Sequence, residues 1–281
     1  MGRRALSLRV TCKVAESTNK SRCAAIAPRT AFCCIARRSH AWLMDTLEYF
    51  LHPKTFLCSA PRHWVLLDVR ADRYLCLNLE DVALLRPWLN GQNEDDATDA
   101  RPDVMPAQAA ALMQQLLDRE LLIPRAASAR PVTPTRWALP TQTLQLSTTS
   151  GLLASIVHAP TFVYSSIFAD HALRRRSLEV ISGRVSRHRA QQSRNRPFPW
   201  ETTSRVIATF NTLRLFYPRS YLCLFDCLAL LQFLSFHSIF PTWVFGVVAD
   251  PFSAHCWLQQ GDVVLNDTVE TVAKFTPIMC L

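Results

Sequence analysis

Short apolar runs broken by turn residues dominate the chain between residues 54 and 78. The runs Lys54–Ala60, His63–Val69 and Arg73–Asn78 are rich in leucine, valine and aromatic residues, and Arg70-Ala71-Asp72 separates the last two. Apolar runs of this length between turn residues predict β-strands. We therefore expect three strands, of which the last two are joined by a tight turn.

Helical periodicity follows these runs. Leu79–Leu89 predicts a first helix, and Asn90–Asp103 is an acidic segment with the composition of a loop. A longer helix is predicted over Met105–Leu122, where Pro106 suits an early helical position. Its apolar residues recur every three or four positions: Ala109, Leu112, Met113, Leu116, Leu117 and Leu121. Strands followed by helices predict a small winged-helix-like α+β domain, to which we assign residues 44–125.

A proline-rich segment divides the chain after this unit. It contains Pro131, Pro134 and Pro140 among alanine, serine and threonine residues, a composition typical of linkers. We assign residues 126–142 to a linker and residues 143–281 to a second domain. The second domain is predicted to begin with three helices: Leu144–Ala169, Asp170–Val185 and Trp200–Tyr217.

The next pattern begins at Pro218, which stops any preceding helix. Ser220 suits an N-cap, and the apolar run behind it predicts a helix over Tyr221–Phe236. Cys223 would then lie in the first turn of that helix. The positive end of a helix dipole stabilises a thiolate, which is the reactive form of cysteine.

A strand and a hairpin complete this pattern. The valine-rich run Trp243–Ala249 predicts a buried strand, and Ser253–Leu258 and Asp262–Leu265 predict the two strands of a hairpin. His255 stands on the first hairpin strand, and Asp267 follows the second. Adjacent antiparallel strands can bring two such side chains within hydrogen-bond reach.

Cys223, His255 and Asp267 therefore form the main candidate site. A thiol nucleophile, an imidazole base and a carboxylate that orients the imidazole are the three parts of cysteine acyl-transfer chemistry. In this interpretation Cys223 attacks, His255 is the general base and acid, and Asp267 orients His255.

Other interpretations of the same residues remain open. Cys227 lies one helical turn after Cys223 and competes as the nucleophile, or it packs in the core. Cys256 adjoins His255, and strand alternation points it to the other face. A zinc site from Cys223, Cys227, His255 and Cys256 is an alternative, although the spacing departs from common zinc patterns. Each residue could also be purely structural.

The C-terminal quarter resembles a known family. Its motifs are Cys223–Leu230, Gly246-Val247, Pro251–Trp257 and Leu265–Asp267. In this order and with these flanks they are similar to the transglutaminase-like leader peptidase of lasso-peptide biosynthesis, the B protein. The resemblance implies a transglutaminase-like or papain-like cysteine peptidase domain with the catalytic residues Cys223, His255 and Asp267. It also implies packing for Cys227, where the family has a small residue.

Residues 44–125 resemble the leader-recognition domain that handles precursor peptides in related pathways. The likeness lies in Leu67-Asp68, Tyr74, Leu77 and Asn78, and in the late leucine-rich helix. It implies that a leader peptide adds as a strand to the sheet edge and packs on the last helix. The implied binding residues are Arg73, Tyr74, Leu75, Cys76, Leu112 and Leu116, which could equally be core residues.

The charge distribution argues against a nucleic-acid partner. The formal charge is +9, but residues 1–43 hold nine Lys or Arg against Glu16 alone, whereas residues 44–281 are almost balanced. We interpret residues 1–43 as a disordered or misassigned extension, with Met44 as the functional start. The basic stretch 174–196 is either a solvated face or a docking patch for an acidic partner.

Cysteine usage and hydropathy indicate a reducing, cytoplasmic compartment, and the resemblance implies that it is bacterial. Of ten cysteines, six follow residue 43, and they show no regular disulfide framework. Gly151–Ala169 is the most apolar stretch, but His158 and Pro160 interrupt it. We therefore expect no stable membrane insertion.

The expected function is leader cleavage in a pathway that depends on ATP. By resemblance, the partners are a precursor peptide and an asparagine-synthetase-like lasso cyclase that closes the macrolactam. The chain has no P-loop pattern, so ATP dependence is expected to reside in that cyclase. No directly bound cofactor and no metal are expected. The alternatives are a transglutaminase-type acyltransferase and a non-enzymatic precursor-peptide chaperone.

Overall fold

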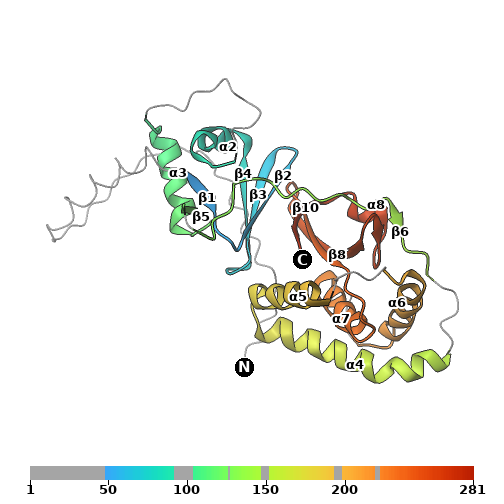
Figure 1. The fold of residues 1–281 in the computed structure, drawn as a ribbon. Helices are drawn as coiled ribbons and strands as arrows, with labels where there is room; N and C mark the ends of the chain where they lie inside the picture. Colours follow the sequence, from blue (N-terminus) through green and yellow to red (C-terminus); the bar gives the residue numbers. More distant parts are fainter. Residues whose placement is uncertain (1–47, 92–103, 126, 147–151, 193–197, 219–221) are drawn as a thin grey trace.

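The structure is a computed structural model that combines helices and strands (Figure 1). It describes residues 48–91, 104–125, 127–146, 152–192, 198–218 and 222–281. The predicted extension 1–43, Met44 and Ser220 lie outside the described residues. Most of the predicted acidic loop Asn90–Asp103 lies outside them as well.

The first sheet is antiparallel and contains the three strands that the sequence predicts. They are β2 (Thr55–Ala60), β3 (His63–Asp68) and β4 (Arg73–Asn78), in the order β2-β3-β4. Both faces are buried, because alternate residues of each strand join different hydrophobic clusters. Leu57 and Leu66 face one cluster, and Cys58 and Val65 face the other.

Helices cover one face of this sheet. They are α2 (Leu79–Leu85), the short 3-10 helix η1 (Arg86–Trp88) and α3 (Ala107–Asp118). The second helix is shorter than predicted, because the chain leaves it for a small antiparallel pair of β1 (Tyr49–Leu51) and β5 (Leu122–Pro124). We did not predict β1 or β5, since three residues give too little periodicity.

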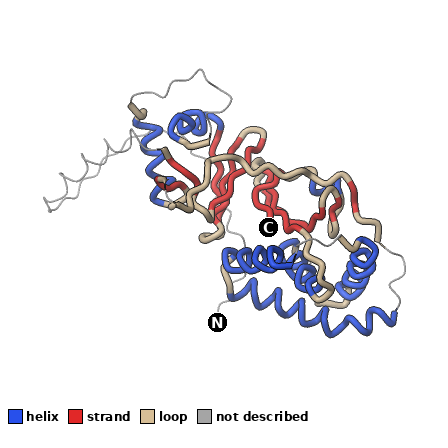
Figure 2. The backbone as a smooth tube through the Cα atoms, in the orientation of Figure 1, coloured by secondary structure: helices blue, strands red, loops and turns tan. Residues whose placement is uncertain are grey.

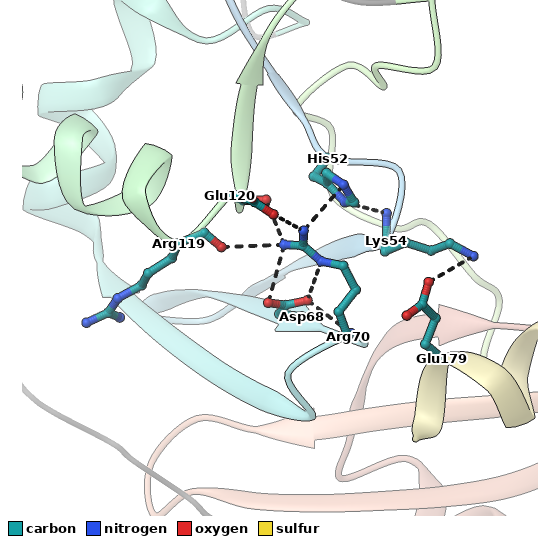
Figure 3. Close-up of polar contacts among 7 residues, drawn as sticks. All are labelled: His52, Lys54, Asp68, Arg70, Arg119, Glu120 and Glu179. Carbon is teal, nitrogen blue, oxygen red and sulfur yellow. Dashed lines mark hydrogen bonds and ion pairs between the residues drawn. The ribbon is translucent and has the colours of Figure 1, made fainter. Parts of the chain in front are cut away.

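Arg70 fastens the end of α3 to the sheet (Figure 3). Its side chain donates to the Asp68 carboxylate at 3.1 Å and to the Glu120 backbone carbonyl at 2.9 Å. It also contacts the Glu120 carboxylate. Nearby, Lys54 reaches across to Glu179 of a later helix at 3.8 Å (Figure 3).

The second sheet has the order β10-β7-β8-β9-β6. Its strands are β6 (Gln142–Thr143), β7 (Thr242–Val248), β8 (Ser253–Gln260), β9 (Val263–Val264) and β10 (Thr276–Cys280). The predicted buried strand and hairpin are confirmed as β7, β8 and β9. We expected the tail after Asp267 to pack on the core, and its β10 is a buried strand beside β7.

Helices gather around this sheet (Figure 1). They are α4 (Leu152–Arg175), α5 (Leu178–Gln192), α6 (Trp200–Arg214), α7 (Cys223–Ser235) and the short α8 (Val269–Val272). The predicted boundary at Ala169–Asp170 is wrong. The chain breaks at Ser177 instead, where the hydroxyl accepts the Val180 N–H at 3.4 Å as a serine at a helix start does.

The two sheets share one hydrophobic core. The β2-β3-β4 face that bears Cys58, Val65 and Tyr74 packs in the same cluster as Phe245 of β7 and Cys256 of β8. The interface is therefore a continuous apolar layer rather than a contact between two polar surfaces.

The proline-rich segment is tied to both sheets along its path. Figure 2 shows it as a loop that runs from the first sheet to the second. The Thr135 N–H donates to Leu57 of β2 at 2.7 Å, and its hydroxyl donates to Ile278 of β10 at 2.8 Å. Arg130 also pairs with Leu51 of β1. The segment predicted as the linker thus runs as a strap that is bonded to both sheets.

Candidate active site

Cys223 is the first residue of α7. Its predicted place in the first helical turn is confirmed, although the N-cap is Leu222 rather than Ser220. The backbone N–H groups of a first turn have no acceptor within the helix, and the helix dipole is positive there. Both effects stabilise negative charge on the Cys223 sulfur.

A buried ion pair fixes the start of α7. One oxygen of Asp226 accepts the Leu222 N–H at 2.8 Å, and the other accepts from Arg214 of α6 at 2.6 Å. The Arg214 side chain is only 3% exposed. Its guanidinium also lies 5.5 Å from the centre of the Phe225 ring. The pair thus holds the backbone of the N-cap residue and joins α7 to α6.

His255 and Asp267 meet as their predicted strands suggested. His255 Nε2 lies 2.6 Å from Asp267 Oδ2. The other carboxylate oxygen accepts the Thr268 N–H at 2.7 Å. The His255 ring packs against Phe275, with the ring centres 5.1 Å apart. The imidazole is therefore held by a carboxylate and by an aromatic ring.

Gly246 makes room for this packing. It pairs with His255 across β7 and β8. A Cβ at this position would lie 2.8 Å from Cβ of Phe275 and 2.9 Å from the Trp257 ring. Side chains do not approach that closely, so the aromatic layer beside His255 requires glycine at position 246.

The Cys223 thiol is in hydrogen-bond contact with His255. Since Nε2 faces Asp267, Nδ1 is the ring nitrogen left for Cys223. A hydrogen bond from the Cys256 thiol, together with the bond to His255, outweighs burial and lowers the pKa of Cys223 to about 4. Burial lowers the pKa of His255, but hydrogen bonds to Asp267 and Cys223 overcome it and raise this pKa to about 10. At neutral pH the site therefore holds a thiolate and an imidazolium.

This geometry agrees with the comparison with known families. Residues 167–280 match the transglutaminase-like superfamily. The match includes Cys223, His255 and Asp267, and members of this superfamily are typically cysteine-dependent enzymes. No curated protein and no solved structure matches the chain significantly.

Two more cysteines lie near Cys223, the candidate nucleophile of the transglutaminase-like domain. Cys256 is buried on the opposite face of β8 from His255, as alternation predicts, yet its thiol still contacts Cys223. The contact arises because α7 packs against that buried face. Cys227 donates to the Cys256 carbonyl at 3.3 Å and accepts from the Asn266 amide at 3.3 Å. Cys227 is fully buried and therefore inaccessible as a nucleophile.

The metal alternative finds no support in the described part of the chain. There, no group of three or more His, Cys, Asp or Glu side chains is arranged to hold a metal ion. In the same part, no helix combines the length and the hydropathy that crossing a bilayer requires.

A cleft of about 250 Å³ opens beside the three candidate residues. Phe210 and Leu230 give it apolar lining, and Asn211 of α6 presents an exposed amide. The sequence did not single out Asn211, Arg214 and Asp226, which line the cleft together with the three candidate residues. Asp226 had a local signal, an acid in the first turn of the helix, whereas Arg214 and Asn211 had none.

The six residues implied for leader binding do not all lie together. Leu75, Cys76, Leu112 and Leu116 line one groove between β4 and α3. Arg73 is exposed at the start of β4 and does not line that groove. Tyr74 is 8% exposed and packs into the core that the two sheets share. Tyr74 therefore does not line this groove, because it lies on the strand face that the transglutaminase-like domain covers.

Proposed function

We propose that the protein is a cysteine peptidase that removes the leader of a lasso precursor peptide. The observation on which this depends is the arrangement of three side chains. Cys223 lies at the N-terminus of α7 with a lowered pKa, and His255 beside it is hydrogen-bonded to Asp267. In this proposal Cys223 is the nucleophile, His255 the general acid and base, and Asp267 the group that fixes the imidazole.

The reaction follows from the protonation states of the site. The Cys223 thiolate attacks the carbonyl carbon at the leader–core junction. The His255 imidazolium then gives its proton to the leaving amine, and the C–N bond breaks to leave a thioester on Cys223. His255 next takes a proton from water, whose oxygen attacks the thioester carbonyl carbon. The C–S bond then breaks and restores the Cys223 thiolate beside the His255 imidazolium. The products are a leader with a free carboxylate and a core with a free N-terminus.

The oxyanion formed in each step needs hydrogen-bond donors. The Cys223 backbone N–H lies in the first turn of α7, where amide groups lack intrahelical acceptors. The exposed Asn211 amide lines the same cleft, which makes it available to a substrate carbonyl. One such donor is commonly worth about 3 kcal/mol in the transition state.

Residues 44–125 would hold the leader as a winged-helix-like recognition domain. The support is the groove between β4 and α3, lined by Leu75, Cys76, Leu112 and Leu116. A peptide that adds to the β4 edge would gain main-chain hydrogen bonds, and the apolar lining would select its side chains. By resemblance, the freed core would pass to an ATP-dependent, asparagine-synthetase-like cyclase in the bacterial cytoplasm. The peptidase itself would use no bound cofactor.

A mass-spectrometric cleavage assay tests this proposal. The purified protein is incubated with synthetic peptides that cover the short open reading frames beside its gene, with and without iodoacetamide. The expected result is one cut that iodoacetamide and Cys223→Ala abolish, while Cys223→Ala still binds the peptide. Cleavage that survives Cys223→Ala would overturn the assignment of the nucleophile.

Acyl transfer to an amine is the second candidate, since residues 167–280 match the transglutaminase-like superfamily. The triad chemistry is the same up to the thioester, and only the acceptor differs. Adding a primary amine to the assay separates the two. A peptidase releases the leader as a carboxylic acid, whereas a transferase releases it as an amide that is heavier than this acid by the mass of the amine minus that of water. A chaperone with structural cysteines is disfavoured by the lowered pKa of Cys223, and an inert Cys223 in that assay would restore it.

A further inference from the structure

The groove beside β4 has two walls that come from different parts of the chain. Its volume is about 420 Å³, and it follows Leu75–Asn78. In the described part of the chain, β4 is the last strand of its sheet and has no neighbour on this edge. One wall is α3, with Leu112 and Leu116. The other is the turn Ala249–Phe252, which joins β7 to β8 in the transglutaminase-like domain.

This second wall offers two kinds of contact. Phe252 is partly exposed, and its ring lies 5.2 Å from the ring of Tyr74, which anchors the turn against β4. Asp250 is exposed, and no ion pair with it is found among the described residues. The turn thus presents an apolar ring and a carboxylate without a counter-ion to the same groove.

We propose that the turn Ala249–Phe252 is a second contact surface for the bound leader. This inference rests on the proposed function and adds to it the residues that the transglutaminase-like domain contributes. Successive side chains of a β-strand point to opposite sides. A leader strand on the β4 edge therefore directs alternate side chains to α3 and the ones between them to the turn. Apolar side chains suit Leu112 and Phe252, and a lysine or arginine suits Asp250.

The same geometry sets the direction of the peptide. Tyr74, near the start of β4, lies in the core cluster that contains Cys256 and against which Cys223 packs. Asn78, at the other end of β4, pairs with His63. The scissile junction follows the leader, so the C-terminal end of the leader must leave the groove at the Tyr74 end. The leader strand is therefore antiparallel to β4.

The turn is also close to the catalytic residues in sequence. β8 begins at Ser253, directly after the turn, and His255 is its third residue. A leader that contacts Phe252 is thus bound one short strand segment from the general base. This arrangement makes the distance from groove to nucleophile a fixed property of the fold, because Phe252 and Tyr74 pack on the core that both sheets share.

Peptide binding to wall variants tests the inference. Fluorescein-labelled synthetic peptides from the N-terminal part of the neighbouring open reading frames are titrated with Cys223→Ala protein, and anisotropy is measured. We expect Phe252→Ala and Asp250→Lys each to weaken binding about tenfold. Phe216→Ala is the matched control, since Phe216 is 80% exposed at the end of α6 and outside the groove. Because the Asp250 side chain is exposed, Asp250→Lys should leave the fold intact. Weaker binding by this variant would therefore report a lost contact with the peptide and not unfolding of the protein.

The outcomes distinguish this inference from the proposed function. If Leu112→Asp weakens binding while both turn variants bind like the parent, the second wall is wrong and the leader peptidase stands. If no peptide binds the parent protein, the proposed function fails, and the inference fails with it.

Cross-linking tests the direction. p-Benzoylphenylalanine is introduced in place of Phe252 in one protein and in place of His63 in another. After irradiation, the Phe252 position is expected to label leader residues nearer the cleavage site than the His63 position does. The reverse order would show a parallel strand and overturn the antiparallel arrangement.

Discussion

Cys223 differs from two other described cysteines in the sign of its pKa shift. Burial raises the pKa of Cys58 and of Cys280 to about 12, whereas hydrogen bonds from Cys256 and His255 lower that of Cys223 to about 4. The difference arises from the donors that surround each sulfur rather than from burial, because all three are largely withdrawn from solvent. Of these three cysteines, only Cys223 should therefore be a thiolate at neutral pH.

The first prediction concerns the pH dependence of that thiolate. A lowered pKa means that the reactive form persists as pH falls and is lost only near the pKa, about 4 for Cys223. We expect the rate of iodoacetamide labelling at Cys223 to stay nearly constant from about pH 8 down to about pH 5. His255→Ala removes a hydrogen bond and a positive charge, so the apparent pKa should rise toward the ordinary value. Labelling rates measured by peptide mass spectrometry check this. A parent profile with an apparent pKa near 9 would contradict it.

The second prediction concerns Cys256. Its own pKa is raised by burial, so it remains a thiol and donates to the Cys223 sulfur. Cys256→Ala should raise the apparent pKa of Cys223 by about one unit or more, since the largest stabilising contact is lost. Cys227→Ala is the matched control: it removes a buried thiol that bonds the Cys256 carbonyl and not Cys223. Equal pKa values in the two variants, read from labelling rate against pH, would refute a direct role for Cys256.

At the scale of elements, α7 begins at Cys223 because Arg214 and Asp226 hold its first turn. Removing one partner of a buried ion pair leaves the other charge without compensation. We expect Asp226→Ala to lower the free energy of unfolding by about 3 kcal/mol. The exposed pair Arg205–Glu201 on α6 is the control, and Arg205→Ala should cost at most about 0.5 kcal/mol. Urea unfolding measures both, and similar losses for the two variants would argue against a special role for the Asp226 pair.

Strong local patterns were sufficient for several elements. β2, β3 and β4 were predicted within one residue at each end, because apolar residues on both strand faces give continuous runs between turns. β7 and the β8–β9 hairpin followed from the same signal. The β1–β5 pair was missed because its stability comes from contacts such as Leu51 with Leu122, which are distant in sequence. The α4–α5 boundary was missed because Ser177 was not recognised as a helix start.

The candidate site shows the same division. Cys223, His255 and Asp267 could be chosen from motif order, since each stands in a recognisable flank. Arg214 could not, because its role depends on how α6 packs beside α7 rather than on its own neighbours. Cys256 was set aside by strand alternation, which gave its face correctly but gave no information about which helix lies there. Tertiary packing, rather than sequence pattern, determines these contributions.

At the scale of the whole molecule, the two sheets are joined by more than a linker. One face of the first sheet lies in the core of the second, and Thr135 bonds strands of both sheets. Lys54 and Glu179 add an exposed contact that contributes little by comparison. The apolar layer is the main connection, so loss of order in one sheet should propagate to the other.

The last prediction follows from this shared core. Tyr74 belongs to the first sheet but packs on Phe252 and among residues of the second. Tyr74→Ala should lower the free energy of unfolding by about 3 kcal/mol, in the range for buried aromatic residues. Its unfolding should remain one transition, seen together by the buried Trp88 of the first part and Trp257 of the second. Hydrogen–deuterium exchange of the peptides that contain Trp88 and Trp257, measured by mass spectrometry at a series of urea concentrations, follows the two parts separately. If Tyr74→Ala shifted only the Trp88 signal, the two parts would be independent units and the shared core would have little energetic weight.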